Sequence, residues 1–169
     1  MTLLVITGTM GSGKTTILAE ASDILKSLKI PHAAIDLDAL AVAYIPERQL
    51  QNAMCENLSS IARNCVRLGV TRLLVARAIE SRAELNRCCR AAGATETMVC
   101  RLVASDQTSE KRVAERERGM LRQQLIERVT KLKTILDAAG IEDFSITNEG
   151  PAVSDVAREV LIRAGWISE

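Results

Sequence analysis

The residues best suited to chemistry lie in a glycine-rich segment near the start of the chain. Residues 8–15 read G-T-M-G-S-G-K-T, which fills every fixed position of the pattern G-x-x-x-x-G-K-[ST]. Its glycines permit positive φ angles and let backbone N–H donors come close to phosphate oxygens. Lys14 adds a charge at the β- and γ-phosphates, and the Thr15 hydroxyl is suited to bind Mg²⁺. This phosphate-binding loop predicts nucleotide binding through Gly8, Met10, Gly11, Ser12, Gly13, Lys14, Thr15 and Thr16.

The surroundings of the loop favour this interpretation. The apolar run Leu3–Thr7 precedes it, and an amphipathic helical pattern begins at Lys14. A glycine-rich turn without a ligand would leave Lys14 unexplained, because a helix N-terminus disfavours a positive charge.

Two acidic residues end the second predicted strand, Ala33–Asp38. Asp36 and Asp38 are two positions apart, so a strand places both carboxylates on one side at its carboxyl end, where open α/β sheets bind ligands. We expect Asp36 to help hold Mg²⁺, directly or through water, and Asp38 to take a proton from a substrate hydroxyl. Both are predicted to contact the substrate. The alternative for Asp38 is that it only caps the following helix.

Two arginines are candidates for the substrate side of the site. Arg77 ends the third predicted strand, Arg72–Arg77, at the same edge of the sheet. We expect it to bind an anionic or hydroxylated substrate, with a structural salt bridge as the alternative. Arg48, shortly after Pro46, is a further substrate-binding candidate. Because the third strand carries no Asp of the Walker B kind, Asp36 remains the metal candidate.

An arginine-rich segment, about residues 106–122, is predicted to form a short mobile lid over the nucleotide. Gly119 offers a hinge, and guanidinium groups suit both phosphate oxygens and the adenine plane. The alternative is a solvated charged helix. The arginines recur at helical spacings: Arg112, Arg116, Arg118 and Arg122.

Short apolar runs alternate with helical patterns along the chain. The alternation predicts an α/β fold with a parallel sheet covered by helices on both faces, in one domain of residues 1–169. The apolar stripes of the first two predicted helices extend to Leu28 and Leu68, and the stripe of the helix before the last strand begins at Leu121. Pro151 is expected in the first turn of the last helix. The predicted strands are Leu3–Thr7, Ala33–Asp38, Arg72–Arg77, Thr97–Ala104 and Asp143–Asn148.

Composition narrows the class of protein. The chain has 169 residues, 47% of them hydrophobic, and a net charge of +1, which gives no general attraction to nucleic acid or membranes. Aromatic residues are 2% of the chain, so the core must be aliphatic. We interpret the five cysteines as small buried hydrophobic residues in a reducing compartment and expect a cytoplasmic protein, either a monomer or a homodimer.

The order of these features resembles the small P-loop kinases. The phosphate-binding loop, the D-x-D strand end, the arginine-rich segment and the final I-T-N-E-G-P-A-V-S-D-V-A-R-E-V-L are similar in layout to shikimate kinase, gluconate kinase, adenylylsulfate kinase and chloramphenicol phosphotransferase. The resemblance implies a three-layer P-loop NTPase fold, a five-stranded sheet of order 2-3-1-4-5, and ATP with Mg²⁺ as phosphoryl donor.

The resemblance also implies roles for individual residues. Asp36 would be the acid on the metal side and Asp38 the acid on the substrate side. The third strand lacks the glycines of shikimate kinase, and the longer D-G-D-x-x-R signature of adenylylsulfate kinase is missing, so the acceptor stays open. The nucleotide would be held by Arg112 on adenine, Arg116 and Arg118 on phosphates, and Asn148 and Pro151 beside the base.

Two functions follow as hypotheses. The first is a kinase that moves the γ-phosphoryl group of ATP to a hydroxyl of a small molecule, with Lys14, Asp38, Arg116 and Arg118 as catalytic residues. The alternative is an ATP-binding regulatory or switch protein without kinase activity. A polynucleotide kinase is disfavoured by the near-neutral charge.

Overall fold

Five parallel strands form the central sheet in the computed structural model, which describes residues 1–41, 43–116, 118–120 and 122–168. Every neighbouring pair in the sheet is parallel, and the order β2-β3-β1-β4-β5 confirms the predicted sheet. The strands are β1 (Thr2–Gly8), β2 (Ala33–Asp36), β3 (Arg72–Ala76), β4 (Glu96–Val103) and β5 (Phe144–Thr147).

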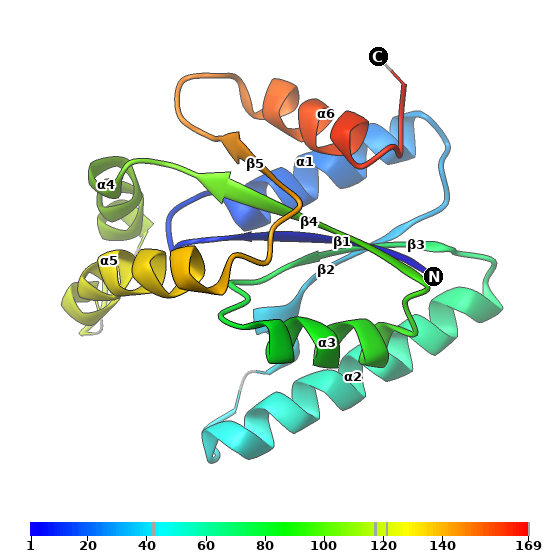
Figure 1. Ribbon diagram of the computed structural model, residues 1–169, viewed down its shortest axis with the longest axis horizontal. Helices are drawn as coiled ribbons and strands as arrows, with labels where there is room; N and C mark the ends of the chain where they lie inside the picture. The colour runs from blue at the N-terminus through cyan, green and yellow to red at the C-terminus, as the bar shows by residue number, and fades with distance from the viewer. Residues whose placement is uncertain (42, 117, 121, 169) are drawn as a thin grey trace.

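Helices cover both faces of the sheet and give the three predicted layers. The helices are α1 (Lys14–Ser27), α2 (Glu47–Arg67), α3 (Arg82–Ala92), α4 (Asp106–Arg116), α5 (Arg122–Ala139) and α6 (Val153–Arg163), with a short 3-10 helix, η1, at Leu37–Leu40. In Figure 1, α1 and α6 lie on one face, α2 and α3 on the other, and α4 and α5 stand near the carboxyl ends of the strands. None of the helices in these described ranges is both long and apolar enough to span a membrane.

The central strand β1 divides the core into two aliphatic clusters. Leu4 and Ile6 pack with side chains of α1 and α6, whereas Leu3 and Val5 pack with side chains of α2 and α3. All four are fully buried, as the period of two in a strand requires when both faces are covered. The aliphatic core predicted from composition is therefore present.

The cysteines only partly follow the prediction. All five are free thiols, and Cys88 and Cys100 are buried. Burial raises the pKa of each of these two thiols to about 12, so they stay protonated. Cys55, Cys65 and Cys89 are only partly buried.

Some helix ends differ from the prediction. Leu28 and Leu68 are 50% and 82% exposed, because each is a C-cap beyond the last helical residue and outside the buried stripe. Pro151 precedes Ala152, the N-cap of α6, and is not in the first turn of that helix. Leu121 lies outside the described residues.

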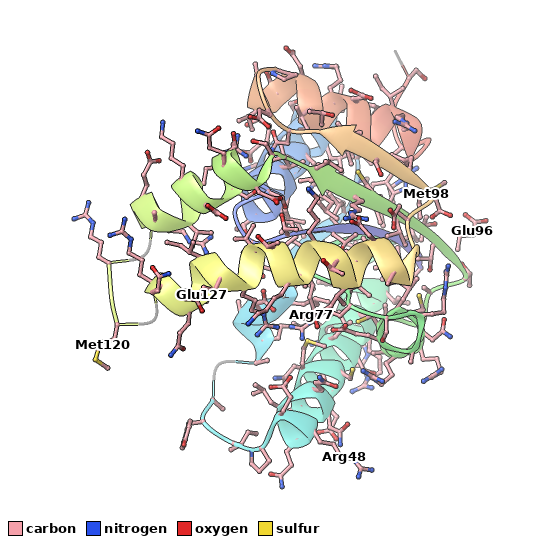
Figure 2. All side chains as sticks on the ribbon, turned by 60° about the vertical axis from the view of Figure 1, so that its left-hand side comes forward. Arg48, Arg77, Glu96, Met98, Met120 and Glu127 are labelled. Carbon is pink, nitrogen blue, oxygen red and sulfur yellow. The ribbon has the colours of Figure 1, made fainter. Side chains whose placement is uncertain are left out.

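The segment expected to be a lid contains α4, the turn that follows it and the start of α5; its residues 117 and 121 lie outside the described ranges. Ser109 and Val113 of α4 are fully buried, so this helix packs on the rest of the molecule. Met120 is 98% exposed, and Figure 2 shows it on the turn that projects away from the helices. The described part of the segment is thus a packed helix followed by an exposed turn.

Candidate active site

The phosphate-binding loop leaves β1 at Gly8 and enters α1 at Lys14, at the carboxyl edge of the sheet. Gly11 and Gly13 have φ angles of 76° and 92°, in the left-handed region that favours glycine. A Cβ atom on Gly11 would lie 2.3 Å from the Ser109 carbonyl oxygen, and one on Gly13 would lie 2.3 Å from Asn148 Nδ2. The loop therefore needs glycine both for its backbone conformation and for the close approach of its neighbours.

Side chains from two segments distant in sequence donate hydrogen bonds to carbonyl oxygens of the phosphate-binding loop. Asn148, directly after β5, donates from Nδ2 to the Ser12 carbonyl oxygen at 2.7 Å and is buried. Arg112 of α4 donates to the Gly11 carbonyl oxygen (3.3 Å) and to the Asn148 carbonyl oxygen (3.0 Å). These hydrogen bonds hold the carbonyl oxygens of Gly11 and Ser12 in place.

Glu149, next to Asn148 in sequence, forms hydrogen bonds with residues at the N-terminal end of α4. Its carboxylate accepts hydrogen bonds from the Thr108 hydroxyl and from the backbone N–H and hydroxyl of Ser105. These bonds lower the pKa of Glu149, the one from Thr108 most. Residues after β5 thus position both the loop and α4, a role that the motif N-E-G-P did not reveal.

The Lys14 side chain extends toward the start of the phosphate-binding loop. Its Nζ donates to the carbonyl oxygens of Gly8 (3.2 Å) and Thr9 (2.9 Å). Burial lowers the pKa of Lys14 to about 8, while the negative charges of Asp38 and Asp36 oppose that shift. A phosphate anion beside this ammonium would stabilise its charged form.

Thr15 and Asp36 bring two oxygen ligands together. Thr15 Oγ1 donates to Asp36 Oδ2 at 2.7 Å, close to the spacing of about 2.9 Å between adjacent ligands of an octahedral Mg²⁺. Within the residues that the structure describes, no cluster of three or more His, Cys, Asp or Glu suits a metal. The pair fits Mg²⁺, which takes few protein ligands and completes its shell with phosphate and water oxygens.

The two acids at the end of β2 have different partners. β2 ends at Asp36, not at Asp38 as predicted, because the Asp36 carboxylate accepts the backbone N–H of Asp38 (3.1 Å) and caps η1. The alternative that Asp38 acts only as that cap is wrong. The Asp38 side chain lies in the first turn of η1, is 66% exposed, and lines the same cavity as Lys14.

Arg77 joins Asp38 to a buried carboxylate. Its Nη1 pairs with Asp38 Oδ1, and its Nε donates to Glu84 Oε1 at 2.8 Å. Burial by itself lowers the pKa of Arg77, but Glu84 and Asp38 outweigh it, and the pKa is raised. The salt bridge that the sequence offered as the alternative role of Arg77 is thus present.

Glu84 forms hydrogen bonds through both its backbone and its carboxylate. The Ser81 hydroxyl does accept the Glu84 backbone N–H (3.2 Å), but the Glu84 carboxylate accepts from the N–H of Glu80 (2.8 Å) and from Arg77. With 6% exposure, this carboxylate is a buried anchor for Arg77. Its pairing with Arg77 depends on how the end of β3 and the start of α3 are arranged.

The predicted nucleotide and acid residues largely converge on one cavity of about 450 Å³. Asp36 and Asp38 line it with two arginines of α4, Arg112 and Arg116. Gly8, Ser12 and Asn148 do not line it, and the side chains of Ser12 and Asn148 are buried. The loop residues in its wall are Met10, Gly11, Gly13, Lys14, Thr15 and Thr16.

Other predicted residues lie elsewhere. Arg118 and Pro151 are exposed and outside the lining of the cavity. Figure 2 shows Arg48 at the far end of α2, pointing away from Arg77, and it is exposed. Arg77 lines two adjoining cavities, of about 240 and about 460 Å³.

These two adjoining cavities are also lined by polar side chains that no sequence pattern indicated. They come from α2, α3 and α5, where each reads as an ordinary surface position of an amphipathic helix, so no local signal marks them. They are Glu47, Gln51, Arg87 and Arg128.

Solved structures share this architecture at low sequence identity. A sugar kinase from Janibacter sp. HTCC2649, in an unliganded structure, has a TM-score of 0.68 at 17% identity, covering 95% of this chain and 92% of that one. Shikimate kinase from Acinetobacter baumannii in complex with shikimate has a TM-score of 0.62 at 16% identity, covering 96% and 91%. A gluconokinase from Sinorhizobium meliloti 1021 has a TM-score of 0.62 at 17% identity, covering 96% and 90%.

These likenesses show the fold. They confirm the predicted resemblance to the small P-loop kinases at the level of architecture. No protein-family model matches the chain, and no curated protein matches it.

Proposed function

We propose that this protein is an ATP-dependent phosphotransferase that moves the γ-phosphoryl group of ATP to a hydroxyl of a small-molecule acceptor. One observation carries the proposal. The Asp38 carboxylate, held by Arg77, lines the same cavity as Lys14 and the Thr15–Asp36 pair. A carboxylate at that place is what a kinase needs to accept the proton of an attacking hydroxyl.

The donor side of the site binds and neutralises charge. The N–H groups of the phosphate-binding loop and the N-terminus of α1 bind the phosphates, and Lys14 adds a positive charge there. Thr15 and Asp36 would hold Mg²⁺, which neutralises charge on the phosphate oxygens when it is bound. Arg112 and Arg116, in the wall of the cavity, supply further cations from α4.

The acceptor side supplies the base. The acceptor oxygen forms a bond to the γ-phosphorus while the bond from that phosphorus to the bridging oxygen of ADP breaks. The proton of the acceptor hydroxyl passes to Asp38, and Arg77 keeps that carboxylate oriented. Arg118, on the exposed turn after α4, reaches the phosphates only if that segment closes over the nucleotide.

The fold likenesses support the class of reaction. The names of the three neighbours describe kinases, with shikimate bound in one structure. An ATP-binding regulatory protein would use the same phosphate-binding loop but would have no need of a positioned carboxylate at Asp38.

ADP formation tests the proposal. The wild-type protein should bind ATP with Mg²⁺ by isothermal titration and release ADP in the presence of a hydroxylated metabolite. Lys14→Ala should keep the far-UV circular dichroism spectrum and lose turnover by about 10²–10³-fold, since it removes a charge aimed at the transferred group. Turnover in Lys14→Ala equal to that of the wild type would contradict the proposal.

A further inference from the structure

A continuous cleft leads away from Asp38. We name the cavity of about 450 Å³ the nucleotide cavity. The cavity of about 240 Å³ shares Asp38 with the nucleotide cavity, and it shares Glu47, Gln51 and Arg77 with the cavity of about 460 Å³. We name these two adjoining cavities the acceptor cleft. Their sizes suit a molecule of modest size, since small-molecule sites commonly measure roughly 300–1,000 Å³.

The acceptor cleft offers no ring-stacking partner. The chain has one Phe, one Trp and one Tyr. Phe144 and Trp166 are buried in the cluster beneath α1 and α6, and Tyr44 is fully exposed. Within the described residues, no aromatic side chain lines the cleft. A nucleobase or aryl acceptor would therefore lack the stacking surface on which such rings are commonly bound.

Two of the three arginines in the described lining of the acceptor cleft already form ion pairs within the protein. Arg77 pairs with Asp38 and Glu84, and Arg128 pairs with Glu80 at 2.9 Å. Counted over the described lining, four carboxylates face three guanidinium groups. An anionic acceptor would enter a cleft with an excess negative charge or would have to break an existing ion pair.

At the far end of the cleft, the Gln51 amide joins the negative Glu47 carboxylate to the positive Arg87 guanidinium, so the two charges offset each other. Gln51 Nε2 donates to Glu47 Oε1 at 3.0 Å, and Gln51 Oε1 accepts from Arg87 Nη2 at 3.2 Å. Each of these groups retains further hydrogen-bonding capacity. Apolar atoms of Ala41, Leu50 and Met54 line the part nearest Asp38. A lining that combines polar groups with apolar side chains matches the hydroxyls and C–H faces of a polyol.

From these features we infer that the acceptor is a neutral, non-aromatic, polyhydroxylated molecule of the sugar or polyol class, with one hydroxyl at Asp38 and others on the Glu47–Gln51–Arg87 string. The inference rests on the proposed kinase function. It adds a discrimination that the fold alone does not supply, because it excludes both nucleosides and sugar acids as preferred acceptors.

A matched panel of acceptors tests the inference. Neutral pentoses, hexoses, hexitols and cyclitols are compared with aldonic and uronic acids of the same carbon number and with nucleosides, and product formation is followed by mass spectrometry. We expect kcat/KM for the best neutral compound to exceed that for its acid counterpart and for any nucleoside by about tenfold or more. A preference for an acid or a nucleoside, or equal use of acid and neutral compounds, would overturn the inference.

A variant that removes one carboxylate tests whether the negative charge of the cleft causes the preference for neutral acceptors. Glu47→Gln keeps the shape of the cleft and removes one carboxylate, so the preference for the neutral compound over its acid should shrink several-fold. Glu56→Gln, on the exposed side of the same helix, should keep the preference of the wild type. An unchanged preference in Glu47→Gln would show that the cleft charge does not set it.

Direct binding separates this inference from the proposed function. Isothermal titration of the panel into Lys14→Ala, which should not transfer phosphate, measures acceptor affinity alone. Binding of a neutral polyol without turnover by the wild type would sustain the acceptor class and contradict the kinase. The same titrations are made into the wild-type protein with and without ATP and Mg²⁺. If no neutral compound binds under either condition, the acceptor class is overturned.

Discussion

At the scale of the residue, the pairing of Asp38 with Arg77 decides how the site works. Arg77 is held on its other side by the buried Glu84, so the position of Asp38, the proposed base, depends on a second carboxylate. Removing Glu84 would leave Arg77 without its buried partner, whereas removing Asp38 would remove the proposed base itself. The two changes therefore affect activity for different reasons.

Asp38→Asn should retain ATP binding and lose phosphoryl transfer. The amide keeps the size of the side chain but cannot accept the proton, which costs about 10²–10⁴ in kcat when a general base is removed. The measurement pairs isothermal titration of ATP–Mg²⁺ with the rate of ADP formation, and Asp23→Asn, exposed on α1, serves as the control. Wild-type kcat in Asp38→Asn would exclude Asp38 as the base.

Most of the loop residues selected from the sequence line the cavity of about 450 Å³. The pattern that contains Lys14 and Thr15 carries its function locally, because the loop and the helix N-terminus are contiguous in the chain. The roles of Arg77 and Glu84 could not be predicted in the same way. Their pairing joins the end of β3 to α3 and to Asp38 across 39 residues of sequence, which no periodicity encodes.

At the scale of the element, α4 packs directly on the phosphate-binding loop. The Ser109 carbonyl oxygen lies where a Cβ of Gly11 would stand, and Arg112 donates to the Gly11 carbonyl oxygen. A change in the loop should therefore be transmitted to α4, and nucleotide bound by the loop should stabilise this helix.

Gly11→Ala should destabilise the fold more than Gly69→Ala. The two glycines have φ angles of 76° and 78°, so each alanine pays a similar strain of about 1–2 kcal/mol. Gly11 alone has backbone of α4 within 2.3 Å of the added methyl group, whereas Gly69 has nothing within 4 Å. Urea unfolding measures the difference. Equal losses of unfolding free energy would mean that α4 does not pack on the loop as described.

Arg116→Ala should weaken ATP binding with little effect on stability. Arg116 lines the nucleotide cavity at the end of α4 and is exposed, so its loss removes charge near the phosphates and little buried area. We expect about a tenfold rise in the Kd of ATP–Mg²⁺ and a nearly constant Tm of the free protein. Lys111→Ala, exposed on the same helix, is the control. A large drop in Tm at unchanged Kd would assign Arg116 a structural role.

At the scale of the whole molecule, the parallel sheet and both helical layers followed from the sequence pattern, whereas the sheet order was implied by the resemblance to the small P-loop kinases. Alternation of strands and helices, with right-handed crossovers, leaves few arrangements open. The acceptor cleft did not follow, because its walls come from α2, α3 and α5, which meet only in the folded protein. Residues such as Gln51 and Arg87 are ordinary polar helix positions until the helices pack together.

Leu3→Ala and Leu4→Ala test whether the two core clusters form one cooperative unit. The two side chains are fully buried on opposite faces of β1, and each substitution should lower the unfolding free energy by about 2–5 kcal/mol. Both variants should unfold in a single transition that circular dichroism and fluorescence of Trp166 report at the same midpoint. Separate transitions in either variant would indicate two independent units in place of one domain.

Detection of the phosphorylated product tests the central claim most directly. Phosphorus-31 NMR of the wild-type protein with ATP, Mg²⁺ and a mixture of hydroxylated metabolites should show the γ-phosphate signal of ATP decrease as a phosphomonoester signal and ADP increase together. Asp38→Asn should leave the ATP spectrum unchanged over the same time. If the wild-type protein binds ATP–Mg²⁺ and yields no phosphomonoester, or only inorganic phosphate, the account of a small-molecule kinase is contradicted and an ATP-binding regulatory protein replaces it.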